Sequence, residues 1–288
     1  MLYQQIDSNK RKTVGIMIGF TLFVLAIGSV TTYIYLGSWI SGVIFAFVIA
    51  VFYCLIMLTG STKMIMGMNG AREVAFSEEQ PYLWNTVEGL AMVARIPMPK
   101  IYLINDKSPN AFATGISPNN SAVAVTIGLI ELLSREELEG VIAHEISHIK
   151  NYDIRLSTVA IALVGVVAIL AHFGTRFLFI RKSKKVDPIL MIIGIFLLIL
   201  SPIIATMIQL ALSRNREYLA DASGAELCRN PIALANALQK ISDVHSPVKH
   251  ASQSCAALYF NDPFKKKKTQ LFSTHPPTEE RIRRLLNM

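Results

Sequence analysis

Residues 134–150, SREELEGVIAHEISHIK, contain the motif around which the rest of the chain can be interpreted. His144 and His148 are four residues apart, so on a helix both imidazoles lie on one face and can bind a single zinc ion. Glu145 lies about 100° round the helix from His144, where it can accept a proton from zinc-bound water without being a ligand. Apolar flanks predict a buried helix, in which unpaired histidines and a glutamate would be costly. The pattern therefore predicts a catalytic zinc site rather than a surface helix with two incidental histidines.

Two histidines and a water leave one position on zinc for a further protein ligand. Glu217 and Asp221 are one helical turn apart, so Glu217 could bind zinc while Asp221 orients a ligand imidazole. The alternative is a pair of exposed carboxylates that form ion pairs with Arg214 and Arg216. The spacing alone does not choose between these two interpretations.

The regions around the motif have the patterns of a mainly helical domain with a small sheet. Ser134 is an N-cap with Glu137 three residues later, which is the capping-box pattern, and the motif itself follows on a second helix from Glu139 to Lys150. A turn is expected at residues 117–120. Periodicity, β-branched residues and prolines predict further helices at 81–94, 214–227 and 231–241, and strands at 100–105, 110–115 and 122–126.

The composition predicts membrane segments. Of the 288 residues, 52% are hydrophobic and only 17% are charged, whereas a soluble domain carries about a quarter charged residues. Long apolar runs occur at 14–36, 39–58, 156–180 and 188–212, and about 20 such residues suffice to span a bilayer. We therefore divide the chain into an N-terminal transmembrane hairpin (1–62), a first catalytic part (63–156), a second hydrophobic hairpin (157–212) and a second catalytic part (213–288).

Basic residues give the expected orientation. They flank the first hairpin at both outer ends, at residues 10–12 and at Lys63 and Arg72, so both ends should face the cytoplasm in a multi-pass protein of the cell membrane. The basic run at 181–185 would lie outside if the second hairpin spans the bilayer, and the alternative is a re-entrant hairpin. The net charge of +8 fits lipid headgroups better than nucleic acid, for which no binding motif is present. The run at 265–268 is interpreted as a solvated loop or a headgroup contact.

The three cysteines, Cys54, Cys228 and Cys255, are far apart and form no C-x-x-C pair. A disulfide framework and a thiolate zinc site are therefore not expected. This agrees with a catalytic part in a reducing cytoplasm.

Four features together resemble the HtpX family, the bacterial membrane heat-stress proteases related to the CAAX prenyl endopeptidases. They are HEISH at 144–148 with Asp153, a hydrophobic hairpin, NREYLAD at 215–221, and STHPPTEER at 273–281. The resemblance extends over nearly the whole chain. It implies a mainly helical, zincin-like catalytic domain with a small sheet, carried on transmembrane helices. It also implies zinc ligands His144, His148 and Glu217, the general base Glu145, and a role for Asp221 in holding the site.

The resemblance also implies roles that the residues alone would not suggest. His275 would help to stabilise the oxyanion and Arg281 would pair with Asp221, although by sequence alone they are a loop histidine and a residue of a basic helix. Asn110, Ala111, Phe112 and Ala113 would form an edge strand on which an extended polypeptide lies by β-augmentation. The implied substrates are misfolded or damaged membrane proteins.

Two other classes of protein fit the sequence less well. A structural zinc site normally has four protein ligands, often Cys, and a transporter would show ionisable residues in its spans and internal symmetry. Neither pattern is present in the motif or in the first two apolar runs. A processing protease for lipidated proteins stays an open alternative.

Overall fold

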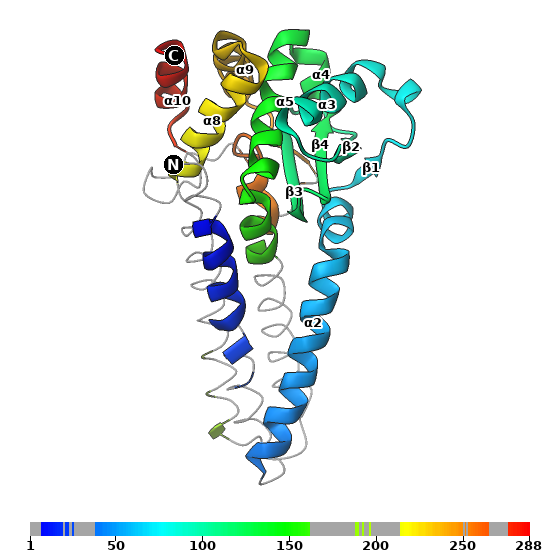
Figure 1. Cartoon of the computed structure of the whole chain (residues 1–288), viewed down its shortest axis with the longest axis vertical. Coiled ribbons are helices and arrows are strands. Elements are labelled where there is room, and N and C mark those ends of the chain that lie inside the picture. The colour runs from blue at the N-terminus through cyan, green and yellow to red at the C-terminus, as the bar shows by residue number, and fades with distance from the viewer. Residues whose placement is uncertain are drawn as a thin grey trace. The chain divides into compact units, whose positions relative to one another are not determined.

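The computed structural model describes residues 7–19, 21, 22, 25, 38–161, 188, 189, 192, 196, 214–249, 251, 253–264 and 276–288. The chain forms two compact units. The first contains Met1–Lys10, Ser61–Thr158 and Leu212–Met288, and the second contains Arg11–Gly60 and Val159–Ala211. Figure 1 labels the helices and strands in chain order. The HEISH motif and the predicted acidic ligand both belong to the first unit.

The first unit contains a four-stranded mixed sheet with the strand order β1-β2-β4-β3. The central strands β2 and β4 are parallel, whereas β1 with β2 and β3 with β4 are antiparallel. Three strands were predicted from sequence, and the fourth, β1, has only three residues and no recognisable alternation. The strands are β1 (Ala71–Glu73), β2 (Lys100–Ile104), β3 (Ala111–Ser117) and β4 (Asn120–Thr126).

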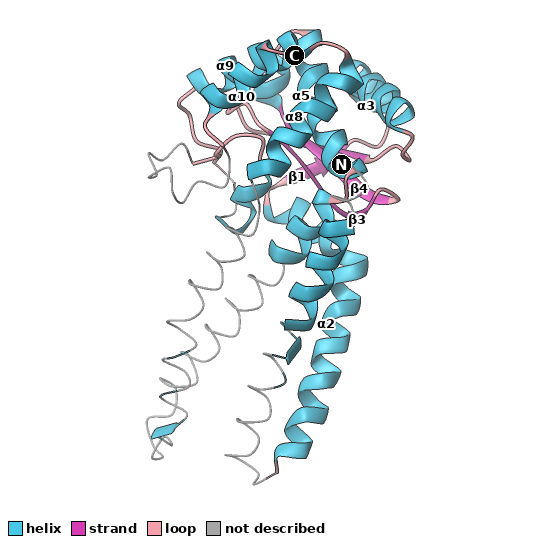
Figure 2. Cartoon of the chain, turned by 60° about the vertical axis from the view of Figure 1, so that its left-hand side comes forward, coloured by secondary structure: helices cyan, strands magenta, loops and turns pink. Residues whose placement is uncertain are grey.

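Helices make up most of the first unit (Figure 2). Their starts follow local chemistry, because α3 and α9 each begin with proline and Ser134 and Glu137 form both bonds of a capping box on α5. The helices are η1 (Ser77–Glu79), α3 (Pro81–Ala94), α4 (Ile127–Leu132), α5 (Arg135–Lys150), α8 (Arg214–Cys228), α9 (Pro231–Asp243), η2 (Gln253–Leu258) and α10 (Thr278–Leu286).

One helix prediction was wrong. The segment after Ser134 and the motif segment from Glu139 were expected to be two helices, but they form the single helix α5. No proline or unfavourable backbone conformation interrupts residues 135–150, and Gly140 is part of the helix, with the backbone of Leu234 on α9 packed against it. A Cβ at Gly140 would lie 3.1 Å from the Cα of Leu234, so the glycine allows the two helices to approach closely.

Helix α5 is the core of the first unit. It packs against α3, α8, α9 and β3, and in Figure 1 it lies between the sheet and the group formed by α8, α9 and α10. Its apolar side chains Val141, Ile142 and Ile146 are fully buried. The motif therefore stands on a helix that packs against three other helices and a strand, which is the setting that a preorganised site requires.

The second unit is described mainly by the first part of α2 (Trp39–Met68), which continues into the first unit. Several large apolar side chains on this part of the helix are exposed, among them Ile44, Phe47 and Phe52. Across the described residues, no helix combines the length and the hydropathy that a membrane crossing requires. The second hydrophobic hairpin (157–212) and the basic runs at 181–185 and 265–268 lie almost wholly outside the described residues.

Candidate active site and metal centre

Three side chains of α5 form the base of the site. His144 and Glu145 are each 1% exposed, and His148 is half-buried one turn further along. The two imidazoles meet edge to face with their centroids 4.7 Å apart, and their Nε2 atoms are 3.1 Å apart. The predicted spacing therefore brings two nitrogen donors to the same point.

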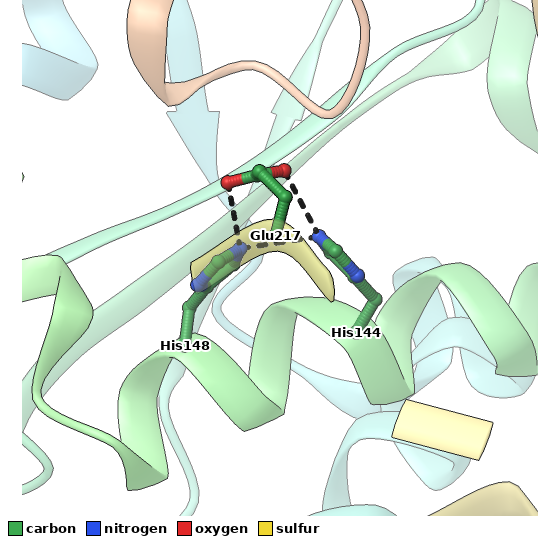
Figure 3. A group of neighbouring side chains, drawn as sticks. All are labelled: His144, His148 and Glu217. Atoms are coloured by element: carbon green, nitrogen blue, oxygen red, sulfur yellow. Dashed lines mark hydrogen bonds and ion pairs between the residues drawn. The ribbon is translucent and has the colours of Figure 1, made fainter. Parts of the chain in front are cut away.

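Helix α8 brings the third group to this point. Gly224 of α8 lies directly against the backbone of His144, and a Cβ there would be 2.9 Å from the His144 nitrogen. This close approach places the Glu217 carboxylate 3.8 Å from Nε2 of His144 and 3.6 Å from Nε2 of His148 (Figure 3). One donor atom from each of the three residues lies within 4.8 Å of the others, as expected of a metal site.

A carboxylate lies at the far nitrogen of each imidazole. Asp153 accepts a hydrogen bond from Nδ1 of His148 at 3.0 Å, and Asp221 lies 3.0 Å from Nδ1 of His144 without the alignment of a hydrogen bond. Such partners fix the tautomer that leaves Nε2 free to bind a metal. Asp153 belongs to the sequence pattern that resembles the HtpX family, but the sequence alone predicts no role for it.

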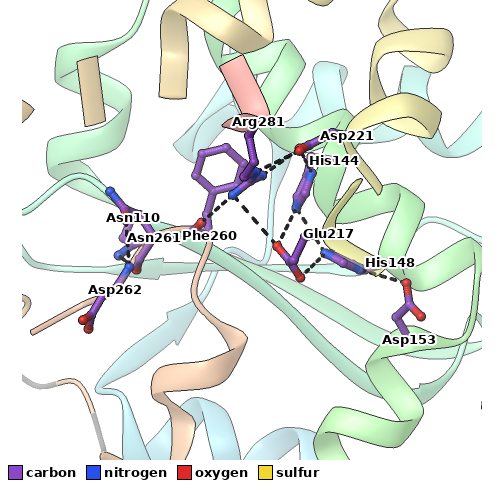
Figure 4. A network of polar contacts seen from close by, with 10 residues as sticks. All are labelled: Asn110, His144, His148, Asp153, Glu217, Asp221, Phe260, Asn261, Asp262 and Arg281. Carbon is purple, nitrogen blue, oxygen red and sulfur yellow. Dashed lines mark hydrogen bonds and ion pairs between the residues drawn. The ribbon is translucent and has the colours of Figure 1, made fainter. Parts of the chain in front are cut away.

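Arg281 ties α10 to the same network. It is 2% exposed and donates to both oxygens of Asp221, from Nε at 2.8 Å and from Nη2 at 2.7 Å (Figure 4). Its Nη1 donates to the carbonyl of Phe260 at 3.3 Å and lies 3.9 Å from Glu217. The alternative of two exposed carboxylates is excluded for Glu217 and Asp221, which are 9% and 2% exposed.

Burial and the neighbouring charges shift the pKa values of the site in different directions. Burial lowers the pKa of His144 to about 4, and Asp221 opposes this only in part. Burial also acts to lower the pKa of His148, but the carboxylates of Asp153 and Glu217 outweigh it and raise that pKa to about 9. At Asp221 the effect of burial is outweighed by Arg281, which lowers the pKa to about 2.

Glu145 differs from the other carboxyl groups of the site. Burial raises its pKa to about 7, so it can both accept and release a proton near neutral pH. It lines a cavity of about 30 Å³ together with His148, Glu217, Ala113 and Arg216. This volume exceeds what one water requires. Arg216 is 5% exposed, and its Nε and Nη1 have no hydrogen-bond partner among the residues that the structure describes, so they can donate to a group that enters the cavity.

The strand β3 lies at the edge of the sheet beside this cavity. The N–H of Thr126 donates to the carbonyl of Asn110 at 3.0 Å, so in the antiparallel register Phe112 also directs its main chain toward β4. The main-chain groups of Ala111, Ala113 and Gly115 then face the open edge. Among the four residues predicted to contact substrate, only Ala111 and Ala113 have this orientation.

Part of that edge is occupied by the chain itself. Phe260 donates its N–H to the carbonyl of Ala111 at 2.8 Å, and the main-chain N–H of Ala113 acts to lower the pKa of Glu145 against the effect of burial. Asn110 exchanges two hydrogen bonds with Asn261, and the Phe112 ring packs edge to face on Tyr259. Residues 259–261 therefore pack along β3, and Ala113 of this strand lies beside the proposed base Glu145.

One predicted site residue, His275, lies outside the described residues. His245 is at the surface, with its Nδ1 2.7 Å from the carbonyl oxygen of Asp243.

Comparisons with known proteins agree with this geometry. Residues 77–288 match the model of Peptidase family M48. Over the full length of both chains, this protein is 54% identical to "Protease HtpX homolog" of Listeria monocytogenes and 50% identical to that of Levilactobacillus brevis. The fold is similar to the crystal structure of Ste24p from S. mikatae, with a TM-score of 0.51 and 20% sequence identity over 98% of this chain and 67% of that one.

A buried HExxH helix that faces a carboxylate on a neighbouring helix, in this fold, defines a metalloprotease. Its substrates are polypeptides. The chain belongs to peptidase family M48, among the proteases named HtpX.

Proposed function

We propose that the chain is a membrane-anchored zinc endopeptidase that hydrolyses misfolded or damaged membrane proteins. The observation that carries this proposal is the convergence of His144, His148 and Glu217 within 4.8 Å, with Glu145 beside them in a cavity. The M48 family and the HtpX relatives make the protease class certain. The metal, the roles of individual residues, the location and the substrates are the proposed parts.

The donor set fits zinc. Two imidazole nitrogens and one carboxylate oxygen, with an open fourth position, form the ligand pattern of catalytic zinc sites, whereas structural sites are closed by four ligands. Glu145, Glu217, Asp221 and Asp153 bring four carboxyl groups to the described site, and only two buried guanidinium groups accompany them. Once zinc has displaced the proton of His148, a divalent cation would neutralise this excess of negative charge. Zinc, when bound, polarises the scissile carbonyl and activates a water.

Glu145 is proposed as the group that moves the proton. Its carboxylate takes a proton from the attacking water and later gives it to the leaving amine, and a pKa of about 7 suits both steps. Asp221 and Arg281 hold His144 and Glu217 in place. His275, assigned by resemblance, would donate to the oxyanion.

The substrate is proposed to bind extended along β3. The outward main-chain groups of β3 can form a β-ladder with a substrate that displaces the N–H of Phe260 from the carbonyl of Ala111, and the bonds of such a ladder are indifferent to side chains. Folded proteins satisfy their own backbone, so selectivity would come from the accessibility of an unfolded segment. This supports substrates that have lost their fold.

A location in the cell membrane is supported by the apolar runs of the sequence, by their basic flanks and by the exposed apolar side chains of α2. The site and both chain ends would face the cytoplasm. A cysteine at Glu88, an exposed position on α3, tests this orientation. An impermeant thiol reagent should label it only after the cells are opened, and labelling of intact cells would contradict the topology.

The mechanism is tested by Glu145→Gln. This variant keeps the three proposed ligands, so it should retain zinc and lose nearly all cleavage of an unfolded protein such as casein. Glu136→Gln, at an exposed position on the same helix, is the matched control and should cleave as the wild type does. Near-normal cleavage by Glu145→Gln would show that another group moves the proton.

A further inference from the structure

The turn after α5 is held in a strained conformation. Tyr152 has a φ of +58°, in the left-handed region that a residue with a Cβ rarely adopts. The next residue is Asp153, which accepts the hydrogen bond from Nδ1 of His148 (Figure 4). Strain of this kind persists only where surrounding contacts enforce it, and it is concentrated at functional sites.

The contacts that hold this turn come from the N-terminal segment of the chain. The side-chain amide of Asn9, which is fully buried, donates to the carbonyl of Asn151 at 3.2 Å and to Oδ1 of Asp153 at 2.6 Å. The next residue, Lys10, places its ammonium 4.7 Å from the centre of the Tyr152 ring. Two consecutive N-terminal residues therefore contact all three residues of the turn.

The two oxygens of Asp153 have different partners. Oδ2 accepts from His148, and Oδ1 accepts from Asn9. With Oδ1 bound, the carboxylate cannot rotate away from the imidazole without losing a short hydrogen bond in a buried site. The proton on Nδ1 then stays in place, and the lone pair of Nε2 stays directed at Glu217 and His144.

We propose that Asn9 and Lys10 form an N-terminal clamp that positions the metal site, with Asn9 acting as a positioning residue for His148 through Asp153. This inference rests on the proposed metal-binding function of His148. It gives the polar residues before the first apolar run a role in metal affinity in addition to their predicted role in membrane orientation. The N-terminal end of the chain and the metal site must then lie on the same side of the membrane.

The clamp predicts a loss of zinc affinity. Removal of a group that supports a metal ligand typically weakens binding or activity about 10- to 100-fold. Asn9→Ala deletes the donor to Asp153, and we expect zinc to bind about tenfold more weakly and to dissociate faster into excess chelator. Asn9→Asp places a second carboxylate against Asp153 and should have a larger effect. The matched control is Asp7→Asn, which changes an exposed side chain of the same segment.

The measurements are made on the full-length chain in detergent and in the Glu145→Gln background, so that the zinc readout does not depend on activity. The zinc Kd is obtained by competition with a chelating dye, and Tm is measured with zinc and with excess chelator. A positioning role predicts a smaller rise of Tm on zinc addition, whereas a merely structural role would lower both Tm values equally. With Glu145 restored, Asn9→Ala should lower kcat and leave KM unchanged.

If Asn9→Ala does not accumulate as folded protein, Asn9→Ser keeps a short donor and Lys10→Met removes only the contact with Tyr152. Both should weaken zinc binding by less than Asn9→Asp. A wild-type chain that bound no zinc would overturn the proposed function and this inference with it. A wild-type chain that binds zinc, with the same Kd as both Asn9→Ala and Asn9→Asp, would overturn this inference alone.

Discussion

Arg281→Met should destabilise the first unit strongly. Arg281 is buried and donates two hydrogen bonds, of 2.8 and 2.7 Å, to Asp221, which is itself 2% exposed. Methionine has a similar length but no charge. The substitution would leave the Asp221 carboxylate in the protein interior next to His144 without its cation, and it would also remove the guanidinium that lies 3.9 Å from Glu217.

The size of the effect follows from this geometry. Removal of one partner of a buried ion pair costs about 3–5 kcal/mol, because the other charge stays buried and uncompensated. In a unit of about 150–250 residues, 1 kcal/mol corresponds to about 2–4 °C in Tm, so the expected loss is about 6–20 °C. Part of the loss would be offset where His144 takes up a proton and pairs with Asp221.

The assay is thermal unfolding in detergent, with zinc and with excess chelator. Arg283→Met is the matched control, because Arg283 lies on the same helix with a side chain that is 71% exposed and paired with Glu280. Its shift should be small, since exposed ion pairs contribute little. Asp221→Asn added to Arg281→Met should restore part of the lost stability, because it removes the orphaned charge.

The result that would refute this reasoning is an Arg281→Met variant that unfolds no earlier than Arg283→Met. A double variant that is less stable by the full sum of its two single changes would also count against it. Either outcome would mean that Asp221 is not held by Arg281 in solution.

Three further predictions follow from the same geometry. In the metal-free protein the raised pKa of His148, about 9, means that this imidazole holds a proton at neutral pH that zinc must displace. The zinc Kd should therefore fall about tenfold per unit of rising pH between about pH 6 and 8, and a Kd independent of pH would contradict the assignment. If substrate pairs with β3, single N-methyl groups placed along a cleaved peptide should block cleavage at alternate positions, since outward main-chain groups recur every second residue; equal tolerance at every position would exclude the ladder. Ser134→Ala should cost about 1 kcal/mol by removing the cap of α5, whereas Ser134→Asp, which keeps an acceptor, should be nearly neutral, and denaturant unfolding compares the two.

Local chemistry made much of the fold predictable. The proline at position 81, the helical periodicity after it and the capping box at Ser134 mark helix starts that depend only on nearby residues. The strands 100–105 and 122–126 were recognisable because they are buried β-branched runs between turn residues. The break that was expected within α5 was wrong because a capping box marks where a helix begins and carries no information about where it ends.

The candidate site was predictable only in part. The helical spacing of HEISH predicts the relative positions of its two histidines and Glu145. Glu217 and Asp221 lie close to these residues only because Gly224 allows α8 to pack against α5. This is a tertiary contact, which local sequence patterns do not predict. The orientation of Phe112 depends on its pairing with β4, and a shift of one residue would reverse it.

Asn9 could not have been found from sequence. It lies more than 140 residues from Asn151 and Asp153, the residues that it holds, and no local pattern connects them. Arg281 was assigned only through resemblance, because an arginine on a basic helix has no local feature that predicts burial.

The most direct test of the account is the zinc content of the purified full-length chain, measured by elemental analysis after gentle detergent extraction. The account predicts about one zinc per chain in the wild type and in Glu145→Gln, since Glu145 is a base and not a ligand. Glu217→Ala should lose most of the metal, because it removes the third of the three groups that converge within 4.8 Å. A wild-type chain without zinc, or a Glu217→Ala chain that keeps a full equivalent, would contradict it.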